Sequence, residues 1–403
     1  MTLHARLAEL AALGATADGI DRALFTSAER AARERFAGWA MAAGLRVEQD
    51  RVGNVFARLV GRDDGAPVQC GSHLDTVRNG GAYDGAYGVV GGLAALERIA
   101  VSGERPPRSL EVVAWAGEEG SRFPLGCLGS AVYAGLTSYD EAAALVGDDG
   151  VGFTDALHGP GGLLDGVPVR DGFPPPAAYL ELHIEQGPVM ERAGVRLGVV
   201  TAIAGQRRLR VTIEGVPGHA GTMPMPGRAD ALCAAGELVL AVERAALDEG
   251  DAVATVGHLA LEPNQTNIVP GRVVLRIDAR SVDDARVAAI ERRVRARAAE
   301  IAAARGVGIG FEPLETRAAV PMDARLRTVV RAACASLDER AMDIASGAGH
   351  DAMCVAQVAP AAMIFVPSIG GRSHVGSERT APADLELGVE ALVAALLAVA
   401  RVP

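Results

Sequence analysis

The stretch Leu110–Gly120 reads LEVVAWAGEEG, an apolar run that is followed almost at once by two adjacent carboxylates. Continuous apolar residues bounded by glycine are typical of a strand that is buried on both faces of a sheet. Similar strand-like runs alternate with helix-like segments along the chain, the strands at Val68–Ser72, Tyr179–Ile184 and Ala361–Val366 and the helices at Ala31–Ala43, Gly88–Ala100 and Leu385–Ala400. This alternation predicts an α/β fold in which helices cover both faces of a mixed sheet.

The pattern changes between Gly205 and Arg317, where amphipathic strands and long helices follow one another in a β-α-β-β-α-β order. The chain has 403 residues, enough for two domains. We therefore expect residues 1–204 and 318–403 to form a larger catalytic domain. Residues 205–317 are expected to form a smaller α+β domain inserted into it.

Composition narrows the class of protein. A net charge of -11 argues against a nucleic-acid partner, although a local arginine could still bind a small anionic molecule. The five cysteines are scattered without a CxxC pair, which indicates buried thiols in a reducing compartment. No leader of the secretory type begins the sequence, and the most apolar segment, Leu385–Ala400, is short and carries Glu386 and Glu390. We expect a cytoplasmic protein with no membrane partner.

Candidate catalytic residues follow the predicted strands. Glu118 and Glu119 come directly after the run at 110–116, where adjacent like charges are costly unless a cation lies close by. In open α/β sheets this end of a strand is also where ligands bind. His73 and Asp75 end another run, and in an extended segment they point the same way, so His73 could bind a metal while Asp75 orients its neighbours. Such a histidine by itself is more often structural.

Three further residues repeat this design. Asp84 lies in the glycine-rich turn Gly80–Gly88, which lacks the pattern of a phosphate-binding loop. His183 and His374 also follow apolar, strand-like runs. Each could be an ordinary turn or core residue, but imidazoles and carboxylates together form the ligand set of zinc or manganese hydrolases.

Eight motifs, taken together, resemble a known family. They are GSHLDTV (71–77), GGAYDGA (80–86), AGEEGSRF (116–123), LHIEQGP (182–188), GHAGTMPM (218–225), NQTNIVPGRVVLRIDAR (264–280), GAGHDAM (347–353) and GGRSH (370–374). In this order they resemble the metallo-aminoacylase and carboxypeptidase-like superfamily of co-catalytic zinc hydrolases. LHIEQGP indicates the branch of N-carbamoyl-L-amino-acid hydrolases, allantoate amidohydrolases and ureidoglycolate-type amidohydrolases. The resemblance covers nearly the whole chain.

The resemblance implies two divalent metal ions, zinc or manganese, with cobalt or nickel as possible substitutes. It implies one ion on His73 and His183, a second on Glu119 and His374, and a bridge between them through Asp84. Glu118 would be the general base, and Asp75 would orient the ligands from behind.

The resemblance also implies substrate-binding residues. His219, Asn267 and Arg280 of the insertion would stabilise the oxyanion and bind a substrate carboxylate, His219 within its own chain or in a partner subunit. Gln186 would face the ureido end of the substrate, and His350 with Asp351 would line the pocket. Arg372 departs from the pattern of the relatives and adds a cation near the metals. The insertion would act as a lid and as the interface of a homodimer.

These expectations converge on a metal-dependent amidohydrolase acting on an N-carbamoyl amino acid or a ureido acid such as allantoate. Two alternatives stay open. One is a dipeptidase or N-acyl-amino-acid hydrolase of the same superfamily, which would release an amino acid or carboxylic acid instead of ammonia. The other is a binding protein without catalysis on this scaffold, against which the presence of Glu118 counts.

Overall fold

The computed structural model describes residues 1–337 and 339–401. The chain divides into two compact units, one made of Met1–Thr201 with Met322–Pro403 and the other of Ala202–Pro321. The second unit contains the segment 205–317, in which an insertion was expected.

The described part of the first unit is built on a mixed sheet of nine strands, two of which reach into residues 202–321. Its strands, in spatial order, are β1 (Arg46–Gln49), β2 (Val55–Leu59), β4 (Leu110–Trp115), β3 (Val68–His73), β5 (Ala178–Ile184), β15 (Ala361–Val366), β6 (Leu197–Ile203) and β13 (Val320–Pro321), with β14 (Ala341–Ser346) paired to β6. The central strands β4, β3, β5 and β15 are parallel to one another, and antiparallel strands flank them. The predicted α/β class with a mixed sheet is confirmed.

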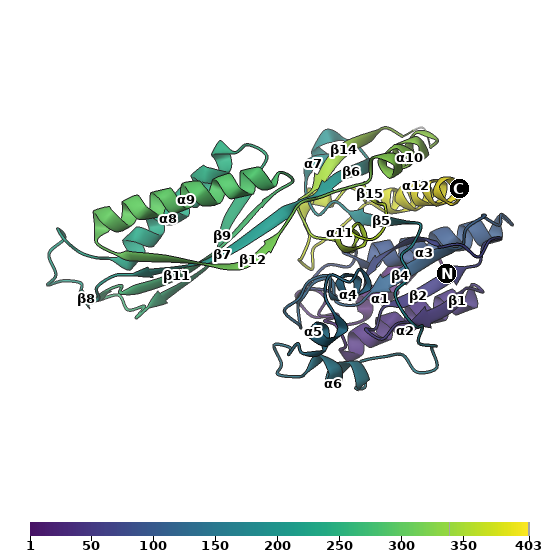
Figure 1. Cartoon of the computed structure of the whole chain (residues 1–403), viewed down its shortest axis with the longest axis horizontal. Coiled ribbons are helices and arrows are strands. Elements are labelled where there is room, and N and C mark those ends of the chain that lie inside the picture. Colours follow the sequence, from purple (N-terminus) through teal and green to yellow (C-terminus); the bar gives the residue numbers. More distant parts are fainter. Residues whose placement is uncertain (338, 402–403) are drawn as a thin grey trace. The chain divides into compact units, whose positions relative to one another are not determined.

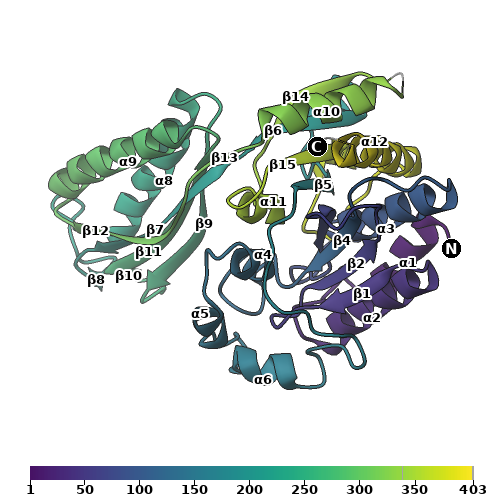
Figure 2. The ribbon, with the colours of Figure 1, turned by 45° about the vertical axis from the view of Figure 1, so that its right-hand side comes forward.

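Alternate residues of the central strands point to opposite faces of this sheet. Cys70, Val112 and Leu180 belong to one large core cluster, to which helices contribute the other side. The helices on this face are α1 (Leu3–Ala12), α2 (Ser27–Ala42), α3 (Ala86–Val101), α10 (Ala324–Ala335) and α12 (Pro382–Ala400). α3 and α12 lie side by side (Figure 2) and both contact β3 and β5.

The opposite face of the sheet is covered by two short helices. α4 (Leu128–Tyr133) and α11 (Asp351–Val355) contact each other, and α11 contacts β5 and β15. The Trp115 ring of β4 packs against Tyr133 of α4, with ring centroids 5.0 Å apart. Both faces of the central sheet are therefore buried, which explains why its strands are continuous apolar runs instead of alternating ones. The remaining short helices are α5 (Tyr139–Ala143), α6 (Phe153–His158), α7 (Val189–Ala193) and the 3₁₀ turn η1 (Ile369–Gly371).

The second unit is a four-stranded antiparallel sheet with two helices on one face (Figure 1). Its elements follow in the order β7 (Gly205–Glu214), α8 (Ala231–Asp248), β9 (Val253–Glu262), β11 (Arg272–Ser281), α9 (Asp284–Arg305) and β12 (Gly308–Arg317). A short ladder of β8 (Gly218–His219) and β10 (Ile268–Val269) lies outside the main sheet. Val287, Ile290, Val294, Ala298 and Ile301 are the buried positions of α9. Their spacing of three and four residues places one apolar stripe against the sheet.

Among the described residues, no helix has both the length and the apolar character needed to cross a bilayer.

Candidate metal centre

Strand parity brings two histidines together. His73 is the last residue of β3, and His183 lies near the end of β5, the parallel neighbour of β3. Side chains alternate between the two faces of a strand. His73 and His183 lie on the same face as Trp115 and Phe365, opposite to the core cluster, so they point to the face covered by α4 and α11. Their rings are buried, with centroids 6.2 Å apart. The carboxyl ends of parallel strands thus supply two imidazoles at one point.

Asp84 lies at the centre of the site and uses its two carboxylate oxygens differently. Oδ1 is 3.5 Å from His73 Nε2 and 3.3 Å from His183 Nε2. Oδ2 is 3.2 Å from His374 Nε2, and that nitrogen is 3.6 Å from Glu119 Oε2. Two groups of possible ligand atoms therefore share Asp84, each with its atoms within 4.8 Å of one another. A carboxylate that faces one imidazole set with each oxygen has the arrangement of a bridging ligand.

Hydrogen bonds behind the two buried rings fix their direction. His73 Nδ1 lies 2.9 Å from the carbonyl oxygen of Asp75, and His183 Nδ1 lies 2.9 Å from the carbonyl oxygen of Ile184. A carbonyl can only accept, so each Nδ1 carries a proton, and each Nε2 is the nitrogen that faces Asp84. Metal-binding histidines need this kind of orientation.

Asp75 has a second role, which follows from the positions of its carboxylate oxygens. Oδ1 accepts a hydrogen bond from the backbone N–H of Glu118 at 3.1 Å, and Oδ2 accepts one from that of Glu119 at 3.2 Å. The same carboxylate is 3.6 Å from His73 Nδ1. Asp75 thus ties the end of β3 to the Glu118–Glu119 turn.

The two glutamates diverge from this turn. Glu118 Oε2 lies 3.9 Å from His73 Nε2, and its Oε1 accepts a hydrogen bond from the Cys127 thiol at 3.2 Å. Glu119 directs one oxygen to His374 and accepts the Val77 N–H with the other at 3.3 Å. Glu118 is thus beside the imidazole pair, while Glu119 belongs to the second group.

Burial and charge act on these groups in opposite directions. Burial raises the pKa of the Glu118 carboxyl, and burial with the nearby Asp84 charge raises that of Glu119 well above its usual range. Burial also opposes ionisation of Asp84, but hydrogen bonds from His183, His374 and His73 outweigh it and hold the pKa of Asp84 well below its ordinary value. A carboxyl with a raised pKa is suited to take up and return a proton near neutral pH.

The imidazoles respond to the same charges. Burial disfavours protonation of His73 and His183, but their hydrogen bonds to Asp84 prevail and raise both pKa values. The hydrogen bond to Asp84 raises the pKa of His374 to about 9. So many buried acidic groups call for positive charge at this point, and imidazole with carboxylate is the donor set that suits zinc or manganese. The residues present therefore fit divalent cations.

Gly85 explains why the Asp84 loop can approach the histidines. Its φ is +62°, and a Cβ built there would lie 2.4 Å from His73 Cε1. The Gly85 N–H also lies 3.1 Å from His183 Nε2. Only glycine leaves room for both rings beside the start of α3.

Two site residues were missed in the sequence. Glu378 accepts hydrogen bonds from the backbone N–H groups of Tyr83 (2.8 Å) and Asp84 (3.1 Å), and its other oxygen lies 2.6 Å from Ser373 Oγ. Ser373 Oγ is also 3.0 Å from Asp84 Oδ2. These contacts hold Asp84 in place and join its loop to the segment that carries His374. Glu378 follows His374 by four residues in a loop, and no local pattern marks it.

The expected pocket residues of the first unit surround this centre to different degrees. Gln186 donates from Nε2 to Asp84 Oδ2 at 2.7 Å, while its buried Oε1 has no hydrogen-bond partner. The His350 ring packs edge-on against His183 with centroids 4.5 Å apart, and its Nε2 lies 2.8 Å from Ser346 Oγ. Its position also allows a third possible ligand group with Glu181 and His183. Arg372 is exposed and contacts Ser377 Oγ at 3.4 Å.

The three expected residues of the second unit lie on separate segments. His219 Nδ1 accepts the N–H of Gly221 at 3.0 Å, which leaves Nε2 to carry the ring proton. Asn267 is exposed in the turn before β10. Arg280 of β11 donates hydrogen bonds from Nε and Nη2 to the carboxylate of Asp278, two residues earlier on the same strand, at 2.8 and 3.0 Å. The guanidinium fork expected for a substrate is thus engaged by an internal carboxylate.

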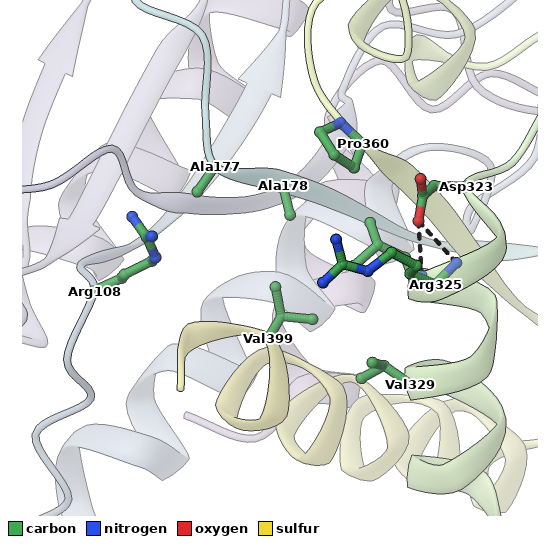
Figure 3. Close-up of a pocket in the computed structure, with 9 residues that line it drawn as sticks. Arg108, Ala177, Ala178, Asp323, Arg325, Val329, Pro360 and Val399 are labelled. Atoms are coloured by element: carbon green, nitrogen blue, oxygen red, sulfur yellow. Dashed lines mark hydrogen bonds between the residues drawn. The ribbon is translucent and has the colours of Figure 1, made fainter. Parts of the chain in front are cut away.

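A cavity of about 200 Å³ lies at the other end of the strands (Figure 3). It adjoins Ala178 at the start of β5 and Pro360 just before β15, and its charged lining residues are Arg108, Arg325 and Asp323. Asp323 is already used there as the N-cap of α10, where it accepts the N–H groups of Arg325 and Leu326. Within the described residues, the possible ligand groups for a metal lie toward the carboxyl ends of the central strands instead.

Comparisons with known proteins agree with this geometry. The model of peptidase family M20/M25/M40 matches residues 70–398. The chain is 38% identical to the N-carbamoyl-L-amino-acid amidohydrolase of Paenarthrobacter aurescens, over 99% of this chain and 98% of that protein. It is 37% identical to the allantoate amidohydrolase of Bacillus subtilis, over 95% and 93%.

A solved structure gives the same result. The crystal structure of an amidase of the hydantoinase/carbamoylase family from Burkholderia multivorans matches with a TM-score of 0.92 and 40% identity, over 100% of this chain and 98% of that one. The resemblance found in the motifs is confirmed, as is the expected class of a hydrolase of C–N bonds other than peptide bonds. The chain belongs to peptidase family M20/M25/M40.

Proposed function

We propose that this protein is a metal-dependent amidohydrolase with two divalent ions, zinc or manganese, which cleaves a C–N bond of an N-carbamoyl amino acid or a ureido acid such as allantoate. The observation that carries the proposal is Asp84. Its Oδ1 faces His73 and His183, while its Oδ2 faces His374, which lies beside Glu119. One ion held by each group of ligands would account for all five residues.

Glu118 is the proposed general base. Divalent cations bound here would acidify a water molecule and polarise the substrate carbonyl. Glu118 would take a proton from the attacking water with Oε2, the oxygen that faces the imidazoles, and would return it to the leaving nitrogen. Asp75 accepts the backbone N–H of Glu118 and lies close to His73 Nδ1, so it fixes the position of the turn that carries Glu118 relative to His73.

Substrate recognition is assigned to polar groups that match a ureido acid. The buried Oε1 of Gln186 is an acceptor without a partner, and a carbamoyl N–H₂ would supply the missing donor. Arg280 and Asn267 are proposed to bind the substrate carboxylate, and His219 is proposed to donate from Nε2 to the oxyanion. Arg372 is proposed to select for a second acidic group.

Relatives guide the choice of substrate. Two relatives that align with this chain over nearly their whole length are named N-carbamoyl-L-amino-acid amidohydrolase and allantoate amidohydrolase. Hydrolysis of the carbamoyl group of such a substrate releases ammonia and carbon dioxide and leaves an amino acid or a related acid.

A homodimer through the second unit is also proposed. β9 is an edge strand of the four-stranded sheet, and it lies next to α8. Both elements expose large apolar side chains, with Leu240 65% and Leu247 68% exposed on α8 and Val253 60% exposed on β9. An unpaired strand edge beside exposed apolar residues is suited to pairing with a second copy. Light scattering of the intact protein and of Leu247→Glu tests this, and an unchanged dimer in the variant would contradict the proposed interface.

The enzyme assay uses metal-free protein reloaded with zinc, manganese or cobalt. N-carbamoyl amino acids, allantoate, dipeptides and N-acetyl amino acids are offered in parallel, and ammonia and amino acids are measured. Metal-dependent ammonia release from the first two classes supports the proposal. Turnover of dipeptides or N-acetyl amino acids alone would favour the peptidase alternative, and binding without turnover would favour a non-catalytic protein.

A further inference from the structure

Cys127 lies against the proposed general base in both backbone and side chain. Its N–H donates to the carbonyl oxygen of Glu118 at 2.8 Å, and the next two N–H groups donate to Gly117 (3.0 Å) and Ala116 (2.8 Å). Three backbone hydrogen bonds thus join the start of α4 to the turn that carries Glu118. The Cys127 side chain is buried and cannot turn away into solvent.

The thiol of Cys127 forms a hydrogen bond with one of the two carboxylate oxygens of Glu118. Its Sγ lies 3.2 Å from Oε1, while Oε2 is the oxygen that faces His73 at 3.9 Å. A protonated thiol is a weak donor and a carboxylate is an acceptor, so the bond runs from Sγ to Oε1. A hydrogen bond with Cys354 and burial raise the pKa of the Cys127 thiol well above its usual range, so it stays protonated and able to donate.

The backbone conformation of Cys127 is unfavourable for a residue that has a side chain. Cys127 has φ +55° and ψ +33°, the left-handed region that glycine occupies without strain. Its contacts to the turn through the backbone need no side chain. A cysteine here is therefore disfavoured by conformation, and its thiol makes one contact with the reaction machinery.

We infer that Cys127 is a positioning residue, whose thiol holds Oε1 of Glu118 so that Oε2 faces the reacting water. This inference rests on the proposed function, because it assigns Glu118 as general base. In this arrangement the thiol acts only through the glutamate.

The test compares Cys127→Gly with Cys127→Ser. Glycine removes the donor and also relieves the left-handed backbone, so Tm should stay equal or rise while kcat falls about tenfold, which corresponds to ~1.4 kcal/mol. KM and metal content should not change. Serine keeps a donor and should retain kcat to within about threefold, because a hydroxyl can bond the same oxygen. Cys334→Ala, a buried thiol in α10 with no contact to the site, is the matched control and should keep full kcat.

A double-mutant cycle separates positioning from a structural effect. In a Glu118→Gln background, Cys127→Gly should cost no further activity, since the group it positions is already lost. A full tenfold loss in that background, or equal losses in the glycine and serine variants, would overturn the inference.

Crystal structures of the two cysteine variants keep the inference testable without activity. The Glu118 carboxylate should leave its present rotamer in Cys127→Gly and keep it in Cys127→Ser, and an unmoved carboxylate in both would refute positioning. Wild-type protein that hydrolyses no carbamoyl or ureido substrate with any metal would refute the proposed function instead, and the rotamer comparison would still decide the role of Cys127.

Discussion

Replacing Gly85 with alanine should destroy the metal centre without unfolding the chain. The new Cβ would lie 2.4 Å from His73 Cε1 and 2.5 Å from both ring nitrogens. Ordinary contact begins at 3.4 Å, so the ring or the loop must move by about 1.0 Å (3.4 minus 2.4). Metal–ligand distances tolerate only about 0.2 Å, so a displacement of this size breaks coordination.

The ring cannot yield easily. His73 Nδ1 is hydrogen bonded to the Asp75 carbonyl, and the loop on the other side is held through Asp84 by Glu378. In addition, Gly85 has φ +62° and ψ -52°, a region outside the left-handed helical one that residues with a Cβ rarely adopt, and alanine there adds about 1–3 kcal/mol of backbone strain. The expected result is loss of at least one metal ion per chain, a fall in kcat of about 100-fold or more, and a modest drop in Tm.

The control is Gly194→Ala. Gly194 has φ +61° and ψ +34°, the left-handed helical region, and a Cβ there would meet nothing within 4 Å, so alanine at this position tests the strain of a positive φ without the clash. Metal content by plasma mass spectrometry, kcat and Tm are measured for both variants. If Gly85→Ala keeps its metal and turns over like Gly194→Ala, the packing of the Asp84 loop against His73 has been misjudged.

Three further predictions concern the same centre. Chelation should abolish hydrolysis and a divalent metal should restore it; full activity in protein shown to be metal-free would refute the metal mechanism. Glu118→Gln should lower kcat by about 10²–10⁴ with metal content and KM nearly unchanged, whereas Glu119→Gln should lose metal and recover part of its activity in excess metal; the reverse result would exchange their roles. Arg280→Ala should raise KM through loss of ~2–5 kcal/mol of carboxylate binding while the fold persists, because Asp278 keeps its bond to Arg208; an unchanged KM would remove Arg280 from the site.

Local sequence patterns predict most of the centre because they report where strands end. His73, His183 and the Glu118–Glu119 pair each follow an apolar run, and parallel strands place such ends along one edge. The alternation of side chains along a strand then determines which face of the sheet each residue points to. The α/β class and the β-α-β-β-α-β order of the second unit follow from the same periodicities.

Contacts between distant segments escape this reasoning. Glu378 reaches Asp84 across 294 residues of sequence, and nothing near either residue indicates the other. The pairing of Arg280 with Asp278 is different, because residues two apart on a strand share a face, and the alternation of β11 could have indicated it. The positions of Cys127, Gln186 and His374 at positive φ are likewise set by the turns they occupy, since no composition rule places such residues there.

The adjacent pair Glu118 and Glu119 shows most clearly what tertiary structure adds. Consecutive carboxylates in a sequence are equivalent on inspection, and only the surrounding groups give them separate tasks. One carboxylate, Asp75, receives both of their N–H groups, so the turn is fixed and the two side chains must leave it in different directions. One then meets a thiol and the His73 ring, and the other meets His374. The different outcomes expected for their two amide variants follow from this division alone, because the substitutions remove the same charge from neighbouring positions.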